Sequence, residues 1–228
     1  TDYREITIKT GVIEKANGSA TCNLGKTQVL AGVKYEIGDP FPDTPNDGVL
    51  SVSAEFVPIA SPDFEPGPPN ENAIELARVV DRGLRESKIL DTSKLCLVPG
   101  KKVWINFLDI YVLDFDGNLF DACNLGAVAA IKSATVPAKA NGLGEDFPMP
   151  VTCTPVAVTS VQIENSILVD PTLDEEKVAA ARLTVTTDDN GDLRAMQKGL
   201  SGALTLEQVR TAIDTSRRLG AEIRKLIG

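Results

Sequence analysis

Three arginines, Arg78, Arg82 and Arg85, follow one another at the spacing of a helical face. Residues four and three apart lie within about 60° on one side of a helix, so the three side chains form one stripe. Arginine makes bidentate contacts with phosphate, and the stripe could therefore clamp a phosphate group or an RNA backbone. It could equally be a solvated helix face, because Glu71 and Glu75 can pair with the arginines. The spacing alone leaves both interpretations open.

Four carboxylates, Asp170, Asp174, Glu175 and Glu176, form a second group that could carry chemistry. Clustered carboxylates can hold Mg²⁺ or act as general acid and base. Acidic residues are also favoured in the first turn of a helix, where they complement the helix dipole. The helix start is the simpler explanation of this group, and the catalytic one stays open beside it.

The composition excludes several classes of site. The 228 residues include no histidine, which rules out Ser-His and Cys-His nucleophile pairs, imidazole acid-base catalysis and His-ligated metals. The 23 Lys and Arg are outweighed by 32 Asp and Glu, so the formal net charge is −9. A general basic coat for nucleic acid is therefore excluded, and any such role needs a local patch. No Walker motif, dinucleotide fingerprint or G-x-S-x-G element occurs.

The four cysteines, Cys22, Cys96, Cys123 and Cys153, form no C-x-x-C pair and each sits in an apolar run. We expect them to be reduced core residues, as suits a cytoplasmic protein. The longest apolar stretch, Leu125–Ile131, is too short for a bilayer, which needs roughly 20 residues. No secretory leader opens the chain, so we expect no membrane partner.

The first third of the chain alternates between apolar and polar residues, which predicts a meander of antiparallel strands. The expected strands are Glu5–Val12, Ser19–Leu24, Thr27–Tyr35 and Val49–Phe56. The composition of the Pro- and Asp-rich segment Gly38–Asp47 predicts an exposed loop.

A helix is predicted over Glu71–Ser87, with Asn70 as its N-cap. Strands are expected over Lys94–Val98 and Lys101–Leu113. The second of these is apolar on both faces, which is typical of a central strand covered on both sides. Asp121–Ser133 follows as a helix that is apolar nearly all round and so should be buried.

The remaining elements repeat this pattern after a Pro- and Gly-rich segment, Val136–Pro150. We expect strands at Val156–Gln162, Ser166–Val169, Leu183–Thr187 and Leu193–Lys198, and helices at Leu173–Ala180 and Leu206–Leu226. Thr205 and Gln208 form a capping box for the last helix. The order of elements indicates one α+β domain, residues 1–228, built from two similar β-sheet-plus-helix halves with buried helices and a possible internal boundary near 136–150.

A third feature is an absence at the start of the buried helix. A helix N-terminus can bind an anion, but the residues expected there, Ala122 to Ala127, include no Ser, Thr, Lys or Arg that could hold phosphate.

The run EPGPPNENAIELARVVDR at residues 65–82 is highly specific. With DYR at 2–4, DTPN at 43–46 and LVDPTLDEE at 168–176, it resembles the non-catalytic ring subunits of the archaeal exosome, which belong to the RNase PH family. The resemblance covers Thr1 to Gly228. Family members usually carry an N-terminal extension before the DYR stretch, and we expect this chain to lack it.

The resemblance implies an RNase PH-like fold and a place in a larger assembly. Such subunits pair with a catalytic RNase PH-type subunit, and three heterodimers close a ring with RNA-binding cap subunits on one face. The assembly degrades single-stranded RNA from its 3′ end with inorganic phosphate.

Three departures from the active members imply that this chain does not catalyse alone. Active members bind phosphate through a Gly-Ser/Thr-Arg element, and the matching stretch here is Ala122 to Ala127. A catalytic Asp of the family matches Glu176, and a further Asp matches Arg182. Because positioning supplies most of the catalysis in phosphoryl transfer, loss of the phosphate clamp should silence the site. We therefore expect no catalytic residue, no metal ligand and no cofactor.

The resemblance also implies that Arg78 and Arg82 reach the partner's active site and contact RNA phosphates, with Arg85 as a third, weaker candidate. Two rival hypotheses remain. One is an autonomous phosphorolytic or metal-dependent ribonuclease that uses Asp170, Asp174 and Glu176. The other is a purely structural ring spacer without RNA contact.

Overall fold

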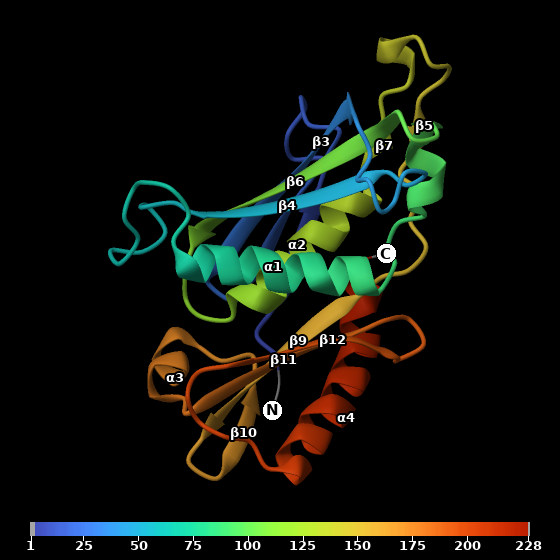
Figure 1. Cartoon of the computed structure of the whole chain (residues 1–228). Coiled ribbons are helices and arrows are strands. Elements are labelled where there is room, and N and C mark those ends of the chain that lie inside the picture. Colours follow the sequence, from blue (N-terminus) through green and yellow to red (C-terminus); the bar gives the residue numbers. More distant parts are fainter. Residues whose placement is uncertain (1–2, 228) are drawn as a thin grey trace.

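The computed structural model describes residues 3–227, so Thr1, Asp2 and Gly228, which the expected domain includes, lie outside the described residues. Two main sheets and three long helices between and beside them make up the fold (Figure 1). The first sheet has the order β1-β2-β3-β6-β4, with β5 paired to β6. Its strands are β1 (Ile6–Thr10), β2 (Gly18–Leu24), β3 (Thr27–Gly38), β4 (Val49–Phe56), β5 (Cys96–Val98) and β6 (Lys102–Asp114).

The second sheet has the order β10-β9-β11-β12 and is antiparallel throughout. Its strands are β9 (Val156–Ile163), β10 (Ser166–Val169), β11 (Ala181–Thr187) and β12 (Leu193–Gly199). The helices are α1 (Glu71–Glu86), α2 (Leu119–Lys132), α3 (Leu173–Val178) and α4 (Leu206–Ile223). The α+β architecture with two sheet-plus-helix halves is thus confirmed.

The expected antiparallel meander is correct for β1, β2 and β3 but wrong for β4. Strand β6 lies between β3 and β4, and β4 runs parallel to β6. The reason is the connection: the chain leaves β4, passes through α1 and returns in β6, and a parallel pair needs such a crossover.

The two faces of β6 differ, so the expectation of a strand covered on both sides is also wrong. Trp104, Leu108 and Ile110 are buried, whereas Ile105 and Phe107 on the other face are half-exposed. Helices α1 and α2 both lie on the first of these faces (Figure 1). The first sheet therefore presents a partly apolar outer surface.

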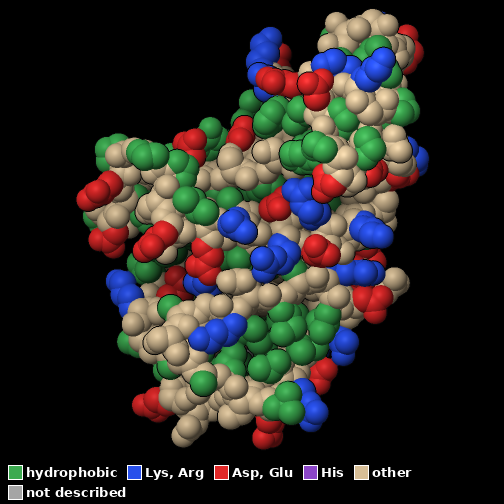
Figure 2. All heavy atoms as spheres, in the orientation of Figure 1, with side chains coloured by type: hydrophobic (Ala, Val, Ile, Leu, Met, Phe, Trp, Pro, Cys, Tyr) green, Lys and Arg blue, Asp and Glu red, His purple; other side chains and the backbone are tan. Residues whose placement is uncertain are grey.

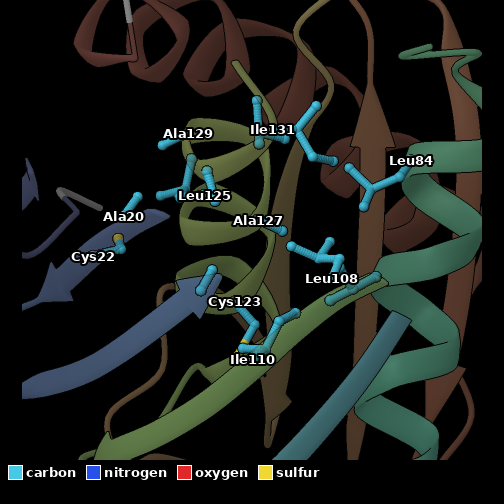
Figure 3. Close-up of a cluster of buried hydrophobic side chains, with 14 of the residues drawn as sticks. Ala20, Cys22, Leu84, Leu108, Ile110, Cys123, Leu125, Ala127, Ala129 and Ile131 are labelled. Atoms are coloured by element: carbon cyan, nitrogen blue, oxygen red, sulfur yellow. The ribbon is translucent and has the colours of Figure 1, made fainter. Parts of the chain in front are cut away.

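Helix α2 is buried along nearly its whole length between the two sheets. It packs against β2, β3 and β6 of the first sheet and β9 of the second. Cys22 of β2, Leu108 of β6 and Leu84 of α1 surround it (Figure 3). Glycine is required at Gly18, because a Cβ atom there would lie 2.5 Å from the carbonyl oxygen of Ala130. This apolar helix joins the two halves through one continuous core.

The predicted helix caps are present. The Asn70 side chain accepts a hydrogen bond from the Ala73 amide at 2.9 Å, and Thr205 with Gln208 forms the capping box of α4. Two shorter predictions need correction. Residues Thr92–Leu95 form a 3₁₀ turn, so only Cys96–Val98 is a strand. The segment Val136–Pro150 contains the short strands β7 (Thr135–Val136) and β8 (Phe147–Pro148).

All four cysteines are free, but only Cys22 and Cys123 are fully buried, while Cys96 and Cys153 are partly exposed. Between residues 3 and 227, none of the helices combines the length and the apolar character that crossing a membrane demands.

Candidate functional site

Helix α1 carries the arginine stripe on its exposed side. Its apolar side, including Leu76, Val80 and Leu84, is buried as predicted. Basic and acidic side chains alternate over the band that α1 occupies on this face of the molecule (Figure 2). The helix therefore presents local positive charge on an acidic protein.

The three arginines differ in what they contact. The Arg85 guanidinium is engaged: Nη2 donates to Oδ1 of Asp81 at 2.7 Å and to the carbonyl oxygen of Leu50 at 3.0 Å. Arg82 makes one long contact, from Nη1 to Oε1 of Gln197 at 3.4 Å. Arg78 is exposed and makes no hydrogen bond or ion pair within residues 3–227. Arg78 and Arg82 are thus the members of the stripe that are available to a ligand.

Two shallow hollows meet at Arg78. One, of about 260 Å³, is lined by Glu75, Arg78, Arg82 and Gln197 among others. The other, of about 470 Å³, lies over the outer face of the first sheet and includes Arg78, Arg85 and Phe107. A chain of phosphates passing over α1 could follow these hollows, and an aromatic ring beside the arginines offers a stacking surface for a base.

The start of α2 lies earlier than the sequence suggested. Helix α2 begins at Leu119, so Ala122 to Ala127 lie inside the helix and are buried, and they do not form its N-terminus. The helix therefore begins two residues before the predicted start at Asp121. The first turn, Leu119 to Ala122, still contains no Ser, Thr, Lys or Arg.

Asn118 precedes α2 and connects three carboxylates. Its φ of 52° lies in the left-handed region, which asparagine tolerates better than most residues. The Asn118 amide donates to Oε1 of Glu176 at 2.9 Å, and its Nδ2 donates to Oδ2 of Asp121 and Oδ1 of Asp170, each at 2.8 Å. The structure thus brings together Asp170 and Glu176, as the sequence proposed, and adds Asn118 and Asp121, which the sequence did not single out.

Asp170 has no free capacity for catalysis. Its side chain is 1% exposed and accepts bonds from the guanidinium of Arg4 at 2.8 and 3.0 Å, from the Arg4 amide at 2.8 Å and from Asn118. A carboxylate that accepts four such bonds is a structural anchor, because all its lone-pair directions are used.

Asp121 is a buried carboxyl group whose contacts are hydrogen bonds donated by neutral groups. Thr159 donates to it from its amide at 2.9 Å and from its hydroxyl at 2.8 Å, and the Tyr3 hydroxyl also donates to it. Burial outweighs these hydrogen bonds and raises the pKa of Asp121 to about 6. The group therefore ties the N-terminal segment to β9 and titrates near neutrality.

Glu176 and Arg182, the two further positions that differ from active members, lie close to the start of α2. Burial raises the pKa of Glu176, although the Asn118 amide and the charges of Arg182 and Arg4 act in the opposite direction. The Arg182 guanidinium donates from Nη2 to Oε1 of Glu75 at 2.8 Å. Both side chains are therefore committed to contacts within the chain.

The other two carboxylates of the predicted group lie apart from this cluster. Asp174 is 97% exposed, and its one ion-pair partner among residues 3–227 is Lys177, at 3.8 Å. Glu175 completes a capping box with Thr172 at the start of α3. Among residues 3–227, no group of three or more acidic, Cys or His residues is arranged to hold a metal ion. The helix-start explanation fits Asp174, Glu175 and Glu176, which lie in the first turn of α3, whereas Asp170 lies before that helix.

Comparisons with known proteins agree over the whole chain. Profiles of the 3′ exoribonuclease family, RNase PH, match residues 2–137 (domain 1) and 153–218 (domain 2). The exosome complex component Rrp42 of Thermoplasma volcanium is 54% identical over 98% of this chain and 86% of its own length.

Solved structures agree with these matches. A chain of the Archaeoglobus fulgidus exosome with RNA bound to the active site superposes with a TM-score of 0.97 at 50% identity, over 100% of this chain and 89% of that one. A chain of an archaeal exosome core gives a TM-score of 0.92 at 46% identity, over 99% of this chain and 87% of that one. The two-sheet fold, the family profiles and these relatives together show that the chain belongs to the 3′ exoribonuclease, or RNase PH, family.

Proposed function

We propose that this chain is a catalytically silent subunit of an exosome ring, in which it shapes the partner's active site and binds RNA. It pairs with a catalytic RNase PH-like subunit, and three such heterodimers form a ring that carries RNA-binding cap subunits. The ring degrades single-stranded RNA from the 3′ end with phosphate. The similarity to Rrp42 components and to exosome chains supports this assembly.

The proposal rests on a contrast between side chains that are already bound within the chain and arginines that are available to a ligand. Glu176 and Arg182, which match acidic positions of the active members, and the buried Asp170 all make contacts within the chain. Arg78, by comparison, has no partner within residues 3–227, and Arg82 has only a long one. The chain therefore offers phosphate-binding cations without the means to activate a phosphate nucleophile.

We propose Arg78 and Arg82 as the RNA-binding residues and Arg85 as a secondary contact. Arg85 would first have to release Asp81 or the carbonyl of Leu50. The free cysteines suit a reducing compartment, and we place the assembly in the cytoplasm.

The autonomous-ribonuclease hypothesis is not favoured, because it needs Asp170, Asp174 and Glu176 to act on one ligand. Asp174 faces solvent while Asp170 is almost fully buried. The spacer hypothesis stays as an outcome of the test below.

The test mixes this chain with a catalytic RNase PH-type partner and records mass in solution and phosphate-dependent RNA decay, for each protein alone and for the mixture. We expect a mass near six subunits, decay by the mixture and none by this chain alone. Nucleoside diphosphate released by this chain alone would overturn the proposal. Assembly without any change of RNA affinity in Arg78 or Arg82 variants would support the spacer.

A further inference from the structure

Arg182 lies in β11 of the second sheet but contacts two of the long helices, α1 and α2. Its side chain is 15% exposed. Nη2 donates to Oε1 of Glu75 on α1 at 2.8 Å, and the guanidinium carbon lies 4.1 Å from the centre of the Phe120 ring in the first turn of α2. A single arginine therefore joins the second sheet to α1 through an ion pair and to α2 through a cation–π contact.

The backbone of β12 leaves this guanidinium little freedom. Gly199 pairs with Arg182 in the sheet, and a Cβ atom at Gly199 would lie 2.5 Å from Nη2 and 2.8 Å from Cζ of Arg182. The absence of a side chain at Gly199 is what admits the guanidinium. It is confined by strand β12, by the Phe120 ring and by Glu75, and it can hold Glu75 in one place.

Glu75 stands on the same side of α1 as the arginines that are available for RNA. Arg78 is three residues further along the helix and Arg82 is seven, so all three side chains share one face. They line the same hollow of about 260 Å³, together with Gln197 of β12. The contacts of β11 and β12 with α1 therefore lie at the edge of the proposed RNA site.

Helix α1 also lies very close to the second sheet. A Cβ atom at Gly83 would lie 3.1 Å from Oγ1 of Thr186, so the helix already sits near its contact limit on β11. The orientation of α1 is set by its buried apolar side together with the polar contacts at its edge. Toward the second sheet these are Glu75 with Arg182 and Arg82 with Gln197, and on the other side Arg85 donates to the carbonyl oxygen of Leu50 in β4.

We propose that Arg182 is a positioning residue for RNA. By holding Glu75, it sets the rotation of α1 at which Arg78 and Arg82 face their shared hollow. This inference rests on the proposed function, because it assumes that these two arginines contact RNA phosphates. Arg182 itself is too buried to be the main contact.

The test uses the reconstituted ring and measures kcat and KM for RNA separately. Arg182→Met keeps much of the side-chain bulk but removes the charge, and Glu75→Gln breaks the same pair from the more exposed partner. We expect each variant to assemble and to raise the KM for RNA by about three- to tenfold with kcat unchanged, which is less than the loss of a direct phosphate contact. Arg218→Met, which removes an exposed ion pair on α4, is the matched control and should change neither constant.

The decisive comparison places Arg182→Met in an Arg78→Ala, Arg82→Ala background. If Arg182 acts by positioning these arginines, the third change adds no further loss. A loss of equal size in both backgrounds, or an unchanged KM in the single variants, would overturn the inference while leaving the proposed function standing. If Arg78→Ala with Arg82→Ala does not raise the KM, the proposed function itself fails. Should Arg182→Met fail to assemble, Glu75→Gln decides in its place.

Discussion

Arg4 and Asp170 form a two-pronged ion pair, with Nε 3.0 Å from Oδ2 and Nη2 2.8 Å from Oδ1. The pair joins the segment before β1 to the end of β10, and so links the N-terminal segment to the second sheet. Asp170 is also bound by the Asn118 side chain at the start of α2. Asp170 thus holds the two halves of the fold together.

Breaking this pair should destabilise the fold strongly. Arg4→Ala leaves the buried Asp170 carboxylate without its counter-charge, and we expect the free energy of unfolding to fall by about 3–5 kcal/mol. Urea unfolding of the native and variant chains measures this change in the free energy of unfolding. Arg218→Ala removes an exposed pair with Glu222 and should cost less than about 1 kcal/mol. Equal losses in the two variants would show that the Arg4 pair contributes no more than a surface contact.

Stability should depend on pH through Asp121. Burial raises the pKa of Asp121 from 3.8 to about 6, so between these values the folded state binds a proton that the unfolded state lacks. The contribution of Asp121 to the free energy of unfolding is therefore fully present below about pH 4. It is lost as the pH rises through about 6, a change on the order of 3 kcal/mol.

Asp121→Asn removes this titration. Relative to the native chain, the variant should gain stability between pH 4 and 7, as measured by urea unfolding at several pH values. A difference between the two proteins that stays constant over this range would refute the titration of Asp121.

Restoring the family's acid should not restore activity. In Glu176→Asp the carboxyl group matches that of active members, but Asp170 remains bound by Arg4 and α2 still begins without a phosphate-binding side chain. We expect no nucleoside diphosphate from the variant alone. We also expect ring activity within about twofold of the native ring, because the Glu176 carboxylate already accepts the Asn118 amide within the chain. Release of product by the variant alone would revive the autonomous-ribonuclease hypothesis.

Arg78 and Arg85 should differ in their effect on RNA binding. Arg78→Ala removes a guanidinium that has no partner in the described part of the chain. The slope of log K against log salt should therefore fall by about 0.7, for one lost phosphate contact of a single strand. Arg85→Ala removes a guanidinium that already holds Asp81, and the slope should change far less. Fluorescence anisotropy of labelled RNA at several salt concentrations gives both slopes. The opposite order would show that Arg85, and not Arg78, carries the contact.

The sequence predicted the elements that depend on local patterns. Helix α1, its Asn70 cap and its arginine face follow from a periodic apolar stripe, and the capping box of α4 follows from Thr205 and Gln208. Such signals involve neighbours in the sequence and are therefore readable from it.

The pairing of strands and the site around Asn118 could not be read in the same way. The neighbours of β4 depend on the path of the chain through α1, which strand periodicity does not record. The contacts of Asn118 join residues 121, 170 and 176, and they exist only because both halves of the fold meet there. A hint was present in the sequence, because Asn118 follows Asp116 and Gly117 at a turn and can adopt the left-handed conformation.

The most direct measurement is phosphate-dependent decay at limiting RNA by a ring that carries Arg78→Glu and Arg82→Glu in this chain. The substitutions lie on an exposed helix face, so assembly should be unchanged. Because two phosphate contacts are replaced by repulsive charges, we predict that kcat/KM for RNA falls about a hundredfold. Unchanged turnover by an intact ring would contradict the account, since the chain would then contribute no RNA contact through the stripe.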